Sequence, residues 1–430
     1  NSVTWDVVTN QVFRDFSTWY HFVVVIDTPE SSAADRVRVY VNGQRVTSFG
    51  TSTYPSQDLD TRFGLSGTNR IGHGEASGSV WTATYLDAYI ADMYYLDGVV
   101  VEETSSVIDS FGELKEGIWI PKEYSGSYGT NGFRLQFKQT GTGTASSSTI
   151  GADTSGNDNH YTTSGFASGD SNIVDCPENN YPTMNPIHKG VDTITFSEGN
   201  LKSSFTSDTD DTMAGCTFAL PKEGKWYWEQ TFTGAATNGS QAPYCGIYDD
   251  DTLALGISDN FINSGGDFIT YYTHNNSIKI ASSSTDYTGS IGNQTGAVVG
   301  FAVDMDNGHL WVHVNGTWIN GTPTYSDGTN KVASPNTDST YIPFWTGNGG
   351  GSMTWEVNFG QSSFTGTKPT GYSILTSANL PETTLGPNSA EQPNDYFNTV
   401  LYTGNGYPAA GTQTISGVGF QSDWTWIKNR

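Results

Sequence analysis

The stretch VVGFAVDMDNGHLWVHVNGTW, residues 298–318, decides the fold of the central part of this chain. Apolar residues alternate with small or polar ones on both sides of residues 306–308, the period-2 pattern of strands that bury one face. Asp, Asn and Gly tolerate the left-handed backbone of a tight hairpin, and Asn315-Gly316 repeats this turn signal. The stretch therefore predicts an antiparallel β-meander with one apolar face.

A second stretch with this pattern of alternating strands and a tight turn occurs early in the chain. Residues 19–27 (WYHFVVVID) have the composition of a strand, and residues 36–46 (RVRVYVNGQRV) alternate in character and turn at Asn42-Gly43. Two hairpins of one kind, far apart in the sequence, indicate two separate sheet domains. We therefore expect an all-β protein built from tandem antiparallel β-sandwiches.

Length and composition agree with this expectation. The chain has 430 residues, enough for two or three domains, and contains 50 glycines and 13% aromatic residues. Short alternating runs rich in Gly and aromatic residues favour all-β architecture. Among these runs we find none of helical length with a period of 3.6 residues.

The charge balance bears on the class of partner. Lys and Arg number 19 against 44 Asp and Glu, which gives a formal net charge of −25. Such a chain repels nucleic acid and anionic membranes, so we expect neither as a partner. We interpret the acidity as a source of solubility, with Ca²⁺ binding by acidic loops as the alternative and no other cofactor expected.

Other sequence features exclude several classes. The three cysteines, Cys176, Cys216 and Cys245, are too few and too scattered for a disulfide framework or a zinc site, and we expect buried thiols. The chain has no apolar stretch of transmembrane length and no signal-peptide core. Membrane insertion is therefore not expected.

The first domain, residues 1–166, carries a set of strand motifs in a recognisable order. The motifs are residues 19–22, 37–43, 69–72 and 89–98. Their order resembles the laminin-G-like branch of the concanavalin-A-like sandwiches, which implies a jelly roll of two sheets. In that family the first strands would precede Trp5, so the sandwich is expected to lack part of its start.

Two segments that follow these motifs carry a second resemblance. Residues 111–137 (FGELKEGIWIPKEYSGSYGTNGFRLQF) and 152–161 (ADTSGNDNHY) look like an extension found after such sandwiches in bacteriophage tail-fibre and related virion proteins. The resemblance implies an extracellular phage particle as the location. It also implies other virion proteins as partners and a homotrimer as the assembly.

The second domain, residues 187–380, contains the opening stretch. In order between Gly224 and Gly360 it reads GKWYWE, GI, the DMDNGHLWVHVNG meander, IPF and VNFG, which resembles the SPRY family closely. The resemblance implies a two-sheet sandwich with ligand-binding loops at its rim and no catalytic motif. Residues 167–186 and 381–394 are predicted linkers, and residues 395–430 are predicted to open a further, truncated β domain.

The chemistry of the side chains indicates which residues are candidates for a functional site. The sequence has no nucleophile elbow, no H-E-x-x-H motif, no P-loop and no E-x-D-x-E pair of a glycan hydrolase, so we expect no catalytic residues. Aromatic and acidic residues near the predicted loops of the second domain are candidates for ligand contact, because aromatics on loops bind sugars and peptides. The candidates are Tyr248, Asp249, Asp250, Asp251, Tyr271, Tyr272, His274 and Trp318.

These observations predict a non-enzymatic, lectin-like adhesion component of a phage virion, a tail fibre or similar appendage. It would bind a glycan or protein receptor on the host surface. The alternative is a purely structural capsid decoration or fibre-shaft protein that binds only virion partners. A glycan depolymerase is less favoured, because no local carboxylate pair is present, and a eukaryotic SPRY signalling protein disagrees with the phage-like flanks.

Overall fold

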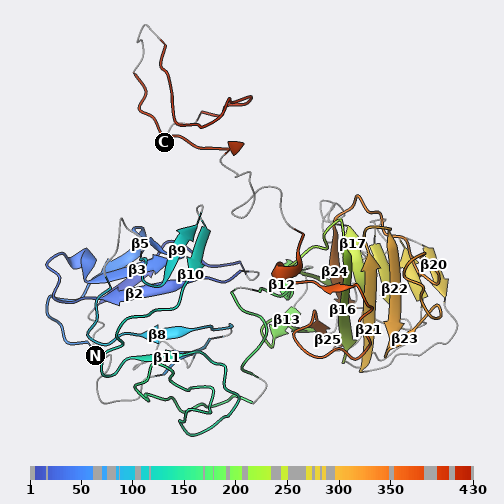
Figure 1. The fold of residues 1–430 in the computed structure, drawn as a ribbon, viewed down its shortest axis with the longest axis horizontal. Helices are drawn as coiled ribbons and strands as arrows, with labels where there is room; N and C mark the ends of the chain where they lie inside the picture. Colours follow the sequence, from blue (N-terminus) through green and yellow to red (C-terminus); the bar gives the residue numbers. More distant parts are fainter. Residues whose placement is uncertain are drawn as a thin grey trace.

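The protein is described by a computed structural model in which residues are arranged almost entirely as strands and loops (Figure 1). Helical structure in the described part is limited to short 3-10 turns such as η1 (Ala33–Asp35) and η4 (Ser377–Asn379). No helix in this part is long and apolar enough to cross a membrane. The all-β class with several antiparallel sheets is therefore confirmed. The structure describes residues 5–15, 18–61, 70–74, 84–86, 88–101, 108–115, 118–167, 170–177, 179–189, 194–205, 212–233, 244–249, 268–273, 277–280, 283–286, 296–347, 353–381, 395–405 and 412–427.

The larger body is a sandwich of two sheets formed by residues 184–374 (Figure 1). All strand pairs in it are antiparallel except β16 with β26. One sheet has the order β12 (Met184–Lys189), β15 (Thr212–Cys216), β24 (Tyr341–Gly347), β17 (Tyr244–Asp249), β18 (Phe268–Tyr272), β19 (Ser277–Ile280) and β20 (Ser283–Asp286). The other has the order β13 (Ile194–Ser197), β14 (Lys202–Phe205), β25 (Met353–Asn358), β16 (Lys225–Phe232), β21 (Ala297–Asp304), β22 (His309–Val314) and β23 (Thr317–Trp318), with β26 (Ser373–Ile374) beside β16.

The predicted meander forms β21, β22 and β23 as expected. The register pairs Val299 with Val314 and Phe301 with Val312, so the alternating apolar residues face the same side. Gly308 at the first turn and Asn315 at the second adopt the left-handed backbone, with φ of 62° and 49°. Of the residues expected to permit the first turn, Gly308 does so, whereas Asp306 and Asn307 do not adopt this backbone.

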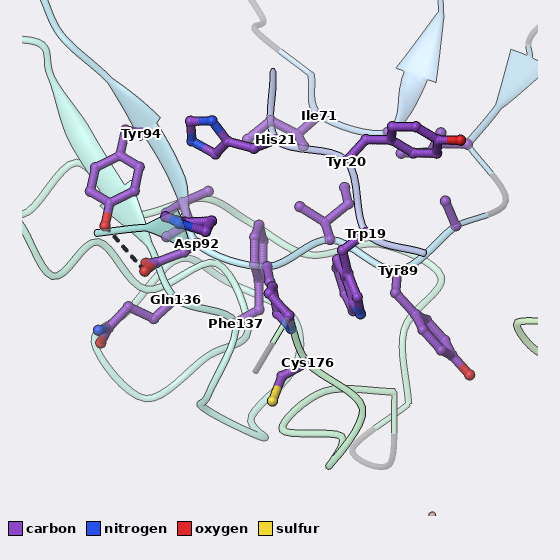
Figure 2. A pocket seen from close by; sticks show the side chains of 18 of the residues that line it. Trp19, Tyr20, His21, Ile71, Tyr89, Asp92, Tyr94, Gln136, Phe137 and Cys176 are labelled. Atoms are coloured by element: carbon purple, nitrogen blue, oxygen red, sulfur yellow. Dashed lines mark hydrogen bonds between the residues drawn. The ribbon is translucent and has the colours of Figure 1, made fainter. Parts of the chain in front are cut away.

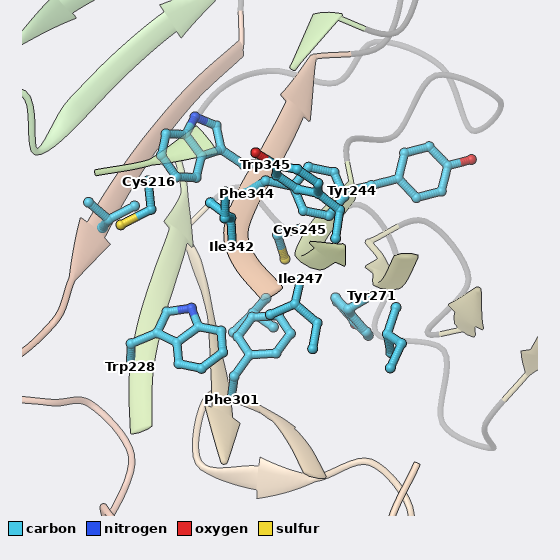
Figure 3. Packing of buried hydrophobic residues seen from close by; sticks show 14 of the residues in the cluster. Cys216, Trp228, Tyr244, Cys245, Ile247, Tyr271, Phe301, Ile342, Phe344 and Trp345 are labelled. Carbon is cyan, nitrogen blue, oxygen red and sulfur yellow. The ribbon is translucent and has the colours of Figure 1, made fainter. Parts of the chain in front are cut away.

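The core between the two sheets is dominated by large aromatic side chains (Figure 3). Trp228 of one sheet stacks on Phe301 of the neighbouring strand, with ring centroids 5.1 Å apart and an interplanar angle of 9°. Trp345 of the other sheet is fully buried and donates its indole N–H to Ser203 Oγ at 3.0 Å. Such aromatic packing removes large apolar areas from water and supplies most of the driving force for this sandwich.

Two of the three cysteines belong to this core. Cys216 and Cys245 are 2% and 0% exposed free thiols, and burial raises the pKa of both. Cys176 is also a free thiol but is only half-buried. The expectation of buried thiols is confirmed for two residues and is wrong for the third, because Cys176 lies in a loop.

The first part of the chain contains several small antiparallel sheets. Within the predicted strand at 19–27, residues 22–26 form a strand, and the predicted hairpin at 36–46 is present, with Asn42 and Gly43 at φ of 48° and 78°. The small hydrophobic core of this first part of the chain contains Val25, Tyr40 and Phe111. The sheets are β1 (Asp6–Thr9) with β5 (Phe49–Thr53), β2 (Phe22–Ile26) with β3 (Val37–Val41) and β4 (Gln44–Arg45), β6 (His73–Gly74) with β7 (Thr84–Tyr85), β8 (Met93–Tyr95) with β11 (Phe133–Leu135), and β9 (Gly112–Lys115) with β10 (Ile118–Pro121).

Three expectations from the sequence are met only in part or not at all. Within the 89–98 motif only residues 93–95 form a strand, and residues 70–72 of the 69–72 motif form none, while Asn69 lies outside the described residues. In residues 395–405 and 412–427 the structure contains no strand, so the expected opening strands of a third domain are not found there. The side chains Trp424 and Trp426 are 74% and 76% exposed, because no sheet face is available in this segment to bury them.

Candidate functional site

A groove of about 2480 Å³ lies in the first part of the chain, between the sheets and the segment at 170–177 (Figure 2). Trp19 and His21 reach it from the residues that lead into β2. Tyr89 and Asp92 reach it from the connection that leads into β8, and Asp175 reaches it from the expected linker. Segments that are distant in sequence thus share one concave surface. A concave surface lined by aromatic and polar side chains is a common form of a ligand site.

Two aromatic rings form a platform on one side of the groove. The rings of Trp19 and Tyr89 are stacked with an interplanar angle of 28° and centroids 6.4 Å apart. Both residues are half-buried and line the groove, and the Tyr89 ring also packs against Gly199. Figure 2 shows the two rings side by side, near Phe137 and Cys176. Rigid aromatic rings of this kind provide large contact area at low conformational-entropy cost.

Asp175 lies beside this platform and is only 5% exposed. Its Oδ1 accepts two hydrogen bonds, from the indole N–H of Trp19 and from the backbone N–H of Tyr181, both at 3.4 Å. These distances exceed the usual range for N–H···O bonds, so the carboxylate is weakly held. Burial raises the pKa of Asp175 to about 6, because removal from water disfavours the charged form.

A tightly paired arginine forms the opposite wall. The Arg134 guanidinium, 8% exposed as a residue, contacts both oxygens of Asp92 at 2.9 and 3.0 Å and also binds Glu123. It lies 5.3 Å from the ring centroid of Tyr94, whose hydroxyl donates to Asp92. Because these partners surround Arg134, its charge is compensated, and this wall provides rigidity rather than a free cation.

The segment at 152–161 supports that wall through one buried carboxylate. Asp153 accepts hydrogen bonds from the backbone N–H groups of Arg134, Ser155 and Asn159 at 2.8–2.9 Å, and these bonds lower its pKa although burial alone would raise it. The Asp153 N–H in turn donates to His160 Nδ1 at 2.9 Å. The segment ADTSGNDNHY is thus a loop built around Asp153, which holds β11 in place.

A further polar atom in the groove is unsatisfied. Within the described residues, His21 Nδ1 is buried without a hydrogen-bond partner, and burial lowers the pKa of this imidazole. The indole Nε1 of Trp119, whose ring centroid is 5.7 Å from that of His21, is also unsatisfied there. Buried polar groups without partners are rare in proteins and mark sites where a ligand or ordered water completes the bonding.

The residues expected to form a ligand-binding rim in the second domain lie elsewhere. Tyr248, Tyr271 and Tyr272 are only 0%, 1% and 9% exposed. The expectation of exposed loop aromatics is wrong for these three, because they belong to the central strands β17 and β18 and fill the core. Tyr248 Oη instead pairs with His188 Nε2 at 2.8 Å.

The other expected rim residues are distributed as follows. Asp249 is 7% exposed at the end of β17, which also corrects the expectation of a solvent-facing acid. Trp318 is half-buried and packs edge-on against His313 at a centroid distance of 5.0 Å. Asp250, Asp251 and His274 lie outside the described residues. In the described part of the chain no cluster of three or more His, Cys, Asp or Glu side chains is arranged to hold a metal ion.

A buried polar network on the outer face of the second sandwich also escaped sequence analysis. His313 Nδ1 accepts the N–H of Gly316 at 3.1 Å, so the ring proton is on Nε2, which donates to Tyr227 Oη at 2.7 Å. The Tyr227 hydroxyl donates to Glu229 Oε1 at 2.7 Å, and Glu229 also accepts the N–H groups of Thr365 and Gly366. Burial lowers the pKa of His313 to about 4.

This network resembles catalytic arrangements in its residue types but not in its exposure. His313 and Glu229 are 1% and 2% exposed, and Tyr227 is fully buried. Each carboxylate oxygen of Glu229 and both ring nitrogens of His313 have partners. The network therefore fixes the segment around residues 364–366 on the sheet, and we assign it a structural role.

Parts of the chain are similar to a family model and to solved structures. A family model described as "Domain of unknown function (DUF7483)" matches residues 392–430, and no curated protein matches the sequence. The crystal structure of the SPRY domain of human HERC1 is similar with a TM-score of 0.30 at 10% identity, covering 41% of this chain and 96% of that chain. The stonustoxin structure is similar with a TM-score of 0.30 at 20% identity, covering 43% of this chain but only 27% of stonustoxin.

Proposed function

We propose that this protein is a non-enzymatic adhesion component of a phage virion, part of a tail fibre or similar appendage. In this proposal the chain carries a laminin-G-like domain at 1–166, which binds a host-surface glycan or protein, followed by a SPRY-like domain at 187–380. The resemblance of residues 111–137 and 152–161 to virion proteins supports the location on the particle. Homotrimeric display would raise weak contacts to useful avidity.

One observation carries the binding proposal. The groove beside Trp19 and Tyr89 combines an aromatic platform with the buried carboxylate of Asp175. The aromatic residues of the second sandwich, by contrast, are mostly used in its own core. We therefore place the receptor-binding surface on the first part of the chain rather than on the rim of the second sandwich.

The test is binding of the recombinant chain to a panel of bacterial cells and to polysaccharides purified from them, with and without EDTA. Saturable binding to some strains supports adhesion, and its loss with EDTA would add Ca²⁺ to the acidic loops. Failure to bind any cell or polysaccharide would contradict the proposal. Release of new reducing ends from a bound polysaccharide would show a depolymerase instead.

A purely structural role is the second candidate, and exposed apolar residues favour it. Phe22 and Val24 are 50% and 57% exposed on one face of β2, which pairs only with β3 among the described strands. The Phe13 ring packs against Phe22 at a centroid distance of 4.9 Å, which extends this surface. Exposed apolar faces of this kind are typical of contacts between subunits. Docking onto virions lacking this protein, without binding to cells, would support this candidate.

A further inference from the structure

We propose that Asp175, together with the Trp19–Tyr89 platform, forms a subsite for one uncharged hexopyranose unit of a surface polysaccharide. This inference rests on the proposed adhesion function and deepens it, because it names the ligand class and the residues that recognise it. The sugar ring would lie against the aromatic platform while two neighbouring hydroxyl groups donate to the carboxylate of Asp175.

The bonding of Asp175 is incomplete in a way that suits hydroxyl donors. Its Oδ1 has only the two long bonds from Trp19 and Tyr181, and its Oδ2 has no hydrogen-bond partner among the described residues. An ionised carboxylate can accept about four hydrogen bonds, and a buried one left short of donors is costly. Neighbouring O–H groups of a sugar ring supply two donors at once without adding a charge.

No cation of the protein compensates this carboxylate. In the described part of the chain Asp175 has no ion pair, whereas Asp92 on the opposite wall is held by both nitrogens of a bidentate Arg134 contact. Asp92 is therefore occupied by the protein itself and Asp175 is open to a ligand. This difference singles out one of the two acidic groups as the recognition group.

The aromatic platform fixes the orientation of the ligand. The stacked rings of Trp19 and Tyr89 lie next to Asp175, and the hydrogen bond from Trp19 ties the platform to the carboxylate. The C–H faces of a hexopyranose are apolar and pack on such rings, while its hydroxyl groups point outward to polar partners.

The charge of the groove argues for an uncharged ligand. The chain as a whole carries 19 basic against 44 acidic residues, so it repels polyanions at long range. The described lining holds five basic and four acidic side chains, so the groove has almost no net charge with which to select a charged ligand. These side chains are Arg45, Arg70, Lys122, Arg134 and Lys138 against Asp92, Glu123, Asp170 and Asp175.

The subsite exists only where the expected linker folds back on the first domain. Two hydrogen bonds place this segment: Ser171 Oγ donates to Gln139 O at 2.7 Å, and Asn172 N donates to Phe137 O at 3.1 Å. Asp175 lies a few residues after Asn172, and its carboxylate accepts the hydrogen bond from the indole N–H of Trp19. The expected linker thus contributes Asp175, the group that would recognise the sugar. The proposed subsite therefore contains residues from both sides of the domain boundary expected at 166.

The experiment measures affinity of the full chain for immobilised dextran and mannan as uncharged probes, alginate as an acidic probe and choline as a cationic competitor. It compares the native protein with Asp175→Asn and Tyr89→Ala. Asp423→Asn and Trp424→Ala are matched controls, because both residues are exposed in the C-terminal segment and neither lines the groove. Thermal unfolding of every variant reports whether it is folded.

We expect binding to dextran or mannan but not to alginate, without competition by choline. Asp175→Asn should weaken that binding about tenfold or more, because hydrogen bonds to a charged group are lost. Tyr89→Ala should weaken it about threefold to tenfold, and the controls should not change it. Saturable polysaccharide binding that both folded groove variants retain would overturn the subsite but leave adhesion intact. Preference for alginate or displacement by choline would overturn the uncharged ligand, and absence of binding to any cell or polysaccharide would overturn adhesion itself.

Discussion

The indole Nε1 of Trp19 lies 3.4 Å from Oδ1 of Asp175, although the two residues are 156 positions apart in the sequence. The contact joins the residues that lead into β2 to a segment expected to be only a linker. It places a buried carboxylate next to an aromatic platform, in a groove that has space for a ligand. This contact therefore bears on both the stability of the protein and the proposed binding.

Substitution Asp175→Asn should stabilise the protein in a pH-dependent way. Because the folded-state pKa of Asp175 is raised to about 6 from 3.8, its stability contribution is lost as pH rises through 6. Asn carries no charge, so the variant should exceed the native protein by about 3 kcal/mol at pH 7.5 and by about 1 kcal/mol at pH 4.5. Urea unfolding at both pH values measures these differences. An equal effect at both pH values would contradict the raised pKa.

His313 should remain neutral far below the usual pKa of histidine. Its pKa is lowered to about 4, because it is buried and its Nδ1 already accepts the N–H of Gly316. Since the folded pKa is depressed, the stability it contributes is complete above pH 6.5. About 3 kcal/mol of that stability is lost as pH falls from there toward 4. NMR detection of the imidazole nitrogens should show a proton on Nε2 at about pH 6, and titration near the usual histidine pKa of 6.5 would disprove this assignment.

The buried ring of His313 leaves no space for a side chain at Gly300. A Cβ atom at Gly300 would lie 1.9 Å from His313 Nε2, so Gly300→Ala must displace the buried ring or distort β21. We expect a loss of about 1–3 kcal/mol of unfolding free energy, as for other overpacked cores. Gly404→Ala is the control, because no atom lies within 4 Å of the corresponding Cβ. Equal stabilities of the two variants would show that the network is not tightly packed.

Tyr248 should affect stability but not binding. Its hydroxyl contacts His188 at 2.8 Å, and the residue is fully buried. Tyr248→Phe should therefore cost about 1 kcal/mol of stability and leave the affinity for cells or polysaccharides unchanged. Equilibrium unfolding and the cell-binding assay measure the two effects. A folded Tyr248→Phe protein that no longer binds would indicate that the receptor site lies on the second sandwich.

The sequence was sufficient to predict strands whose pattern is local. The alternation in residues 298–318 and the Asn-Gly pairs at 42–43 and 315–316 predicted both hairpins, since strand period and turn chemistry depend on neighbouring residues only. The aromatic residues Tyr248 and Tyr271 were placed on a rim incorrectly. Their strands are central in a sheet, and sheet order depends on contacts between distant residues.

The groove could not be predicted for the same reason. Asp175 lies in a proline-containing segment without alternation, which by itself indicates a linker, and only the fold brings it to Trp19. A weak signal was present, because Asp175 is an isolated acid in the apolar run Ile173-Val174-Asp175-Cys176. An acid in such a run is either exposed or held for a purpose, and the structure shows it 5% exposed.

The most direct test of the account is hydrogen–deuterium exchange of the full chain, with and without a saturating polysaccharide from a strain that it binds. We predict that protection appears in peptides covering residues 19–21, 88–94 and 170–177, because these segments line one groove. Peptides from residues 296–347 of the second sandwich should exchange as before. Protection confined to the second sandwich, with no change in the three groove segments, would contradict the central claim.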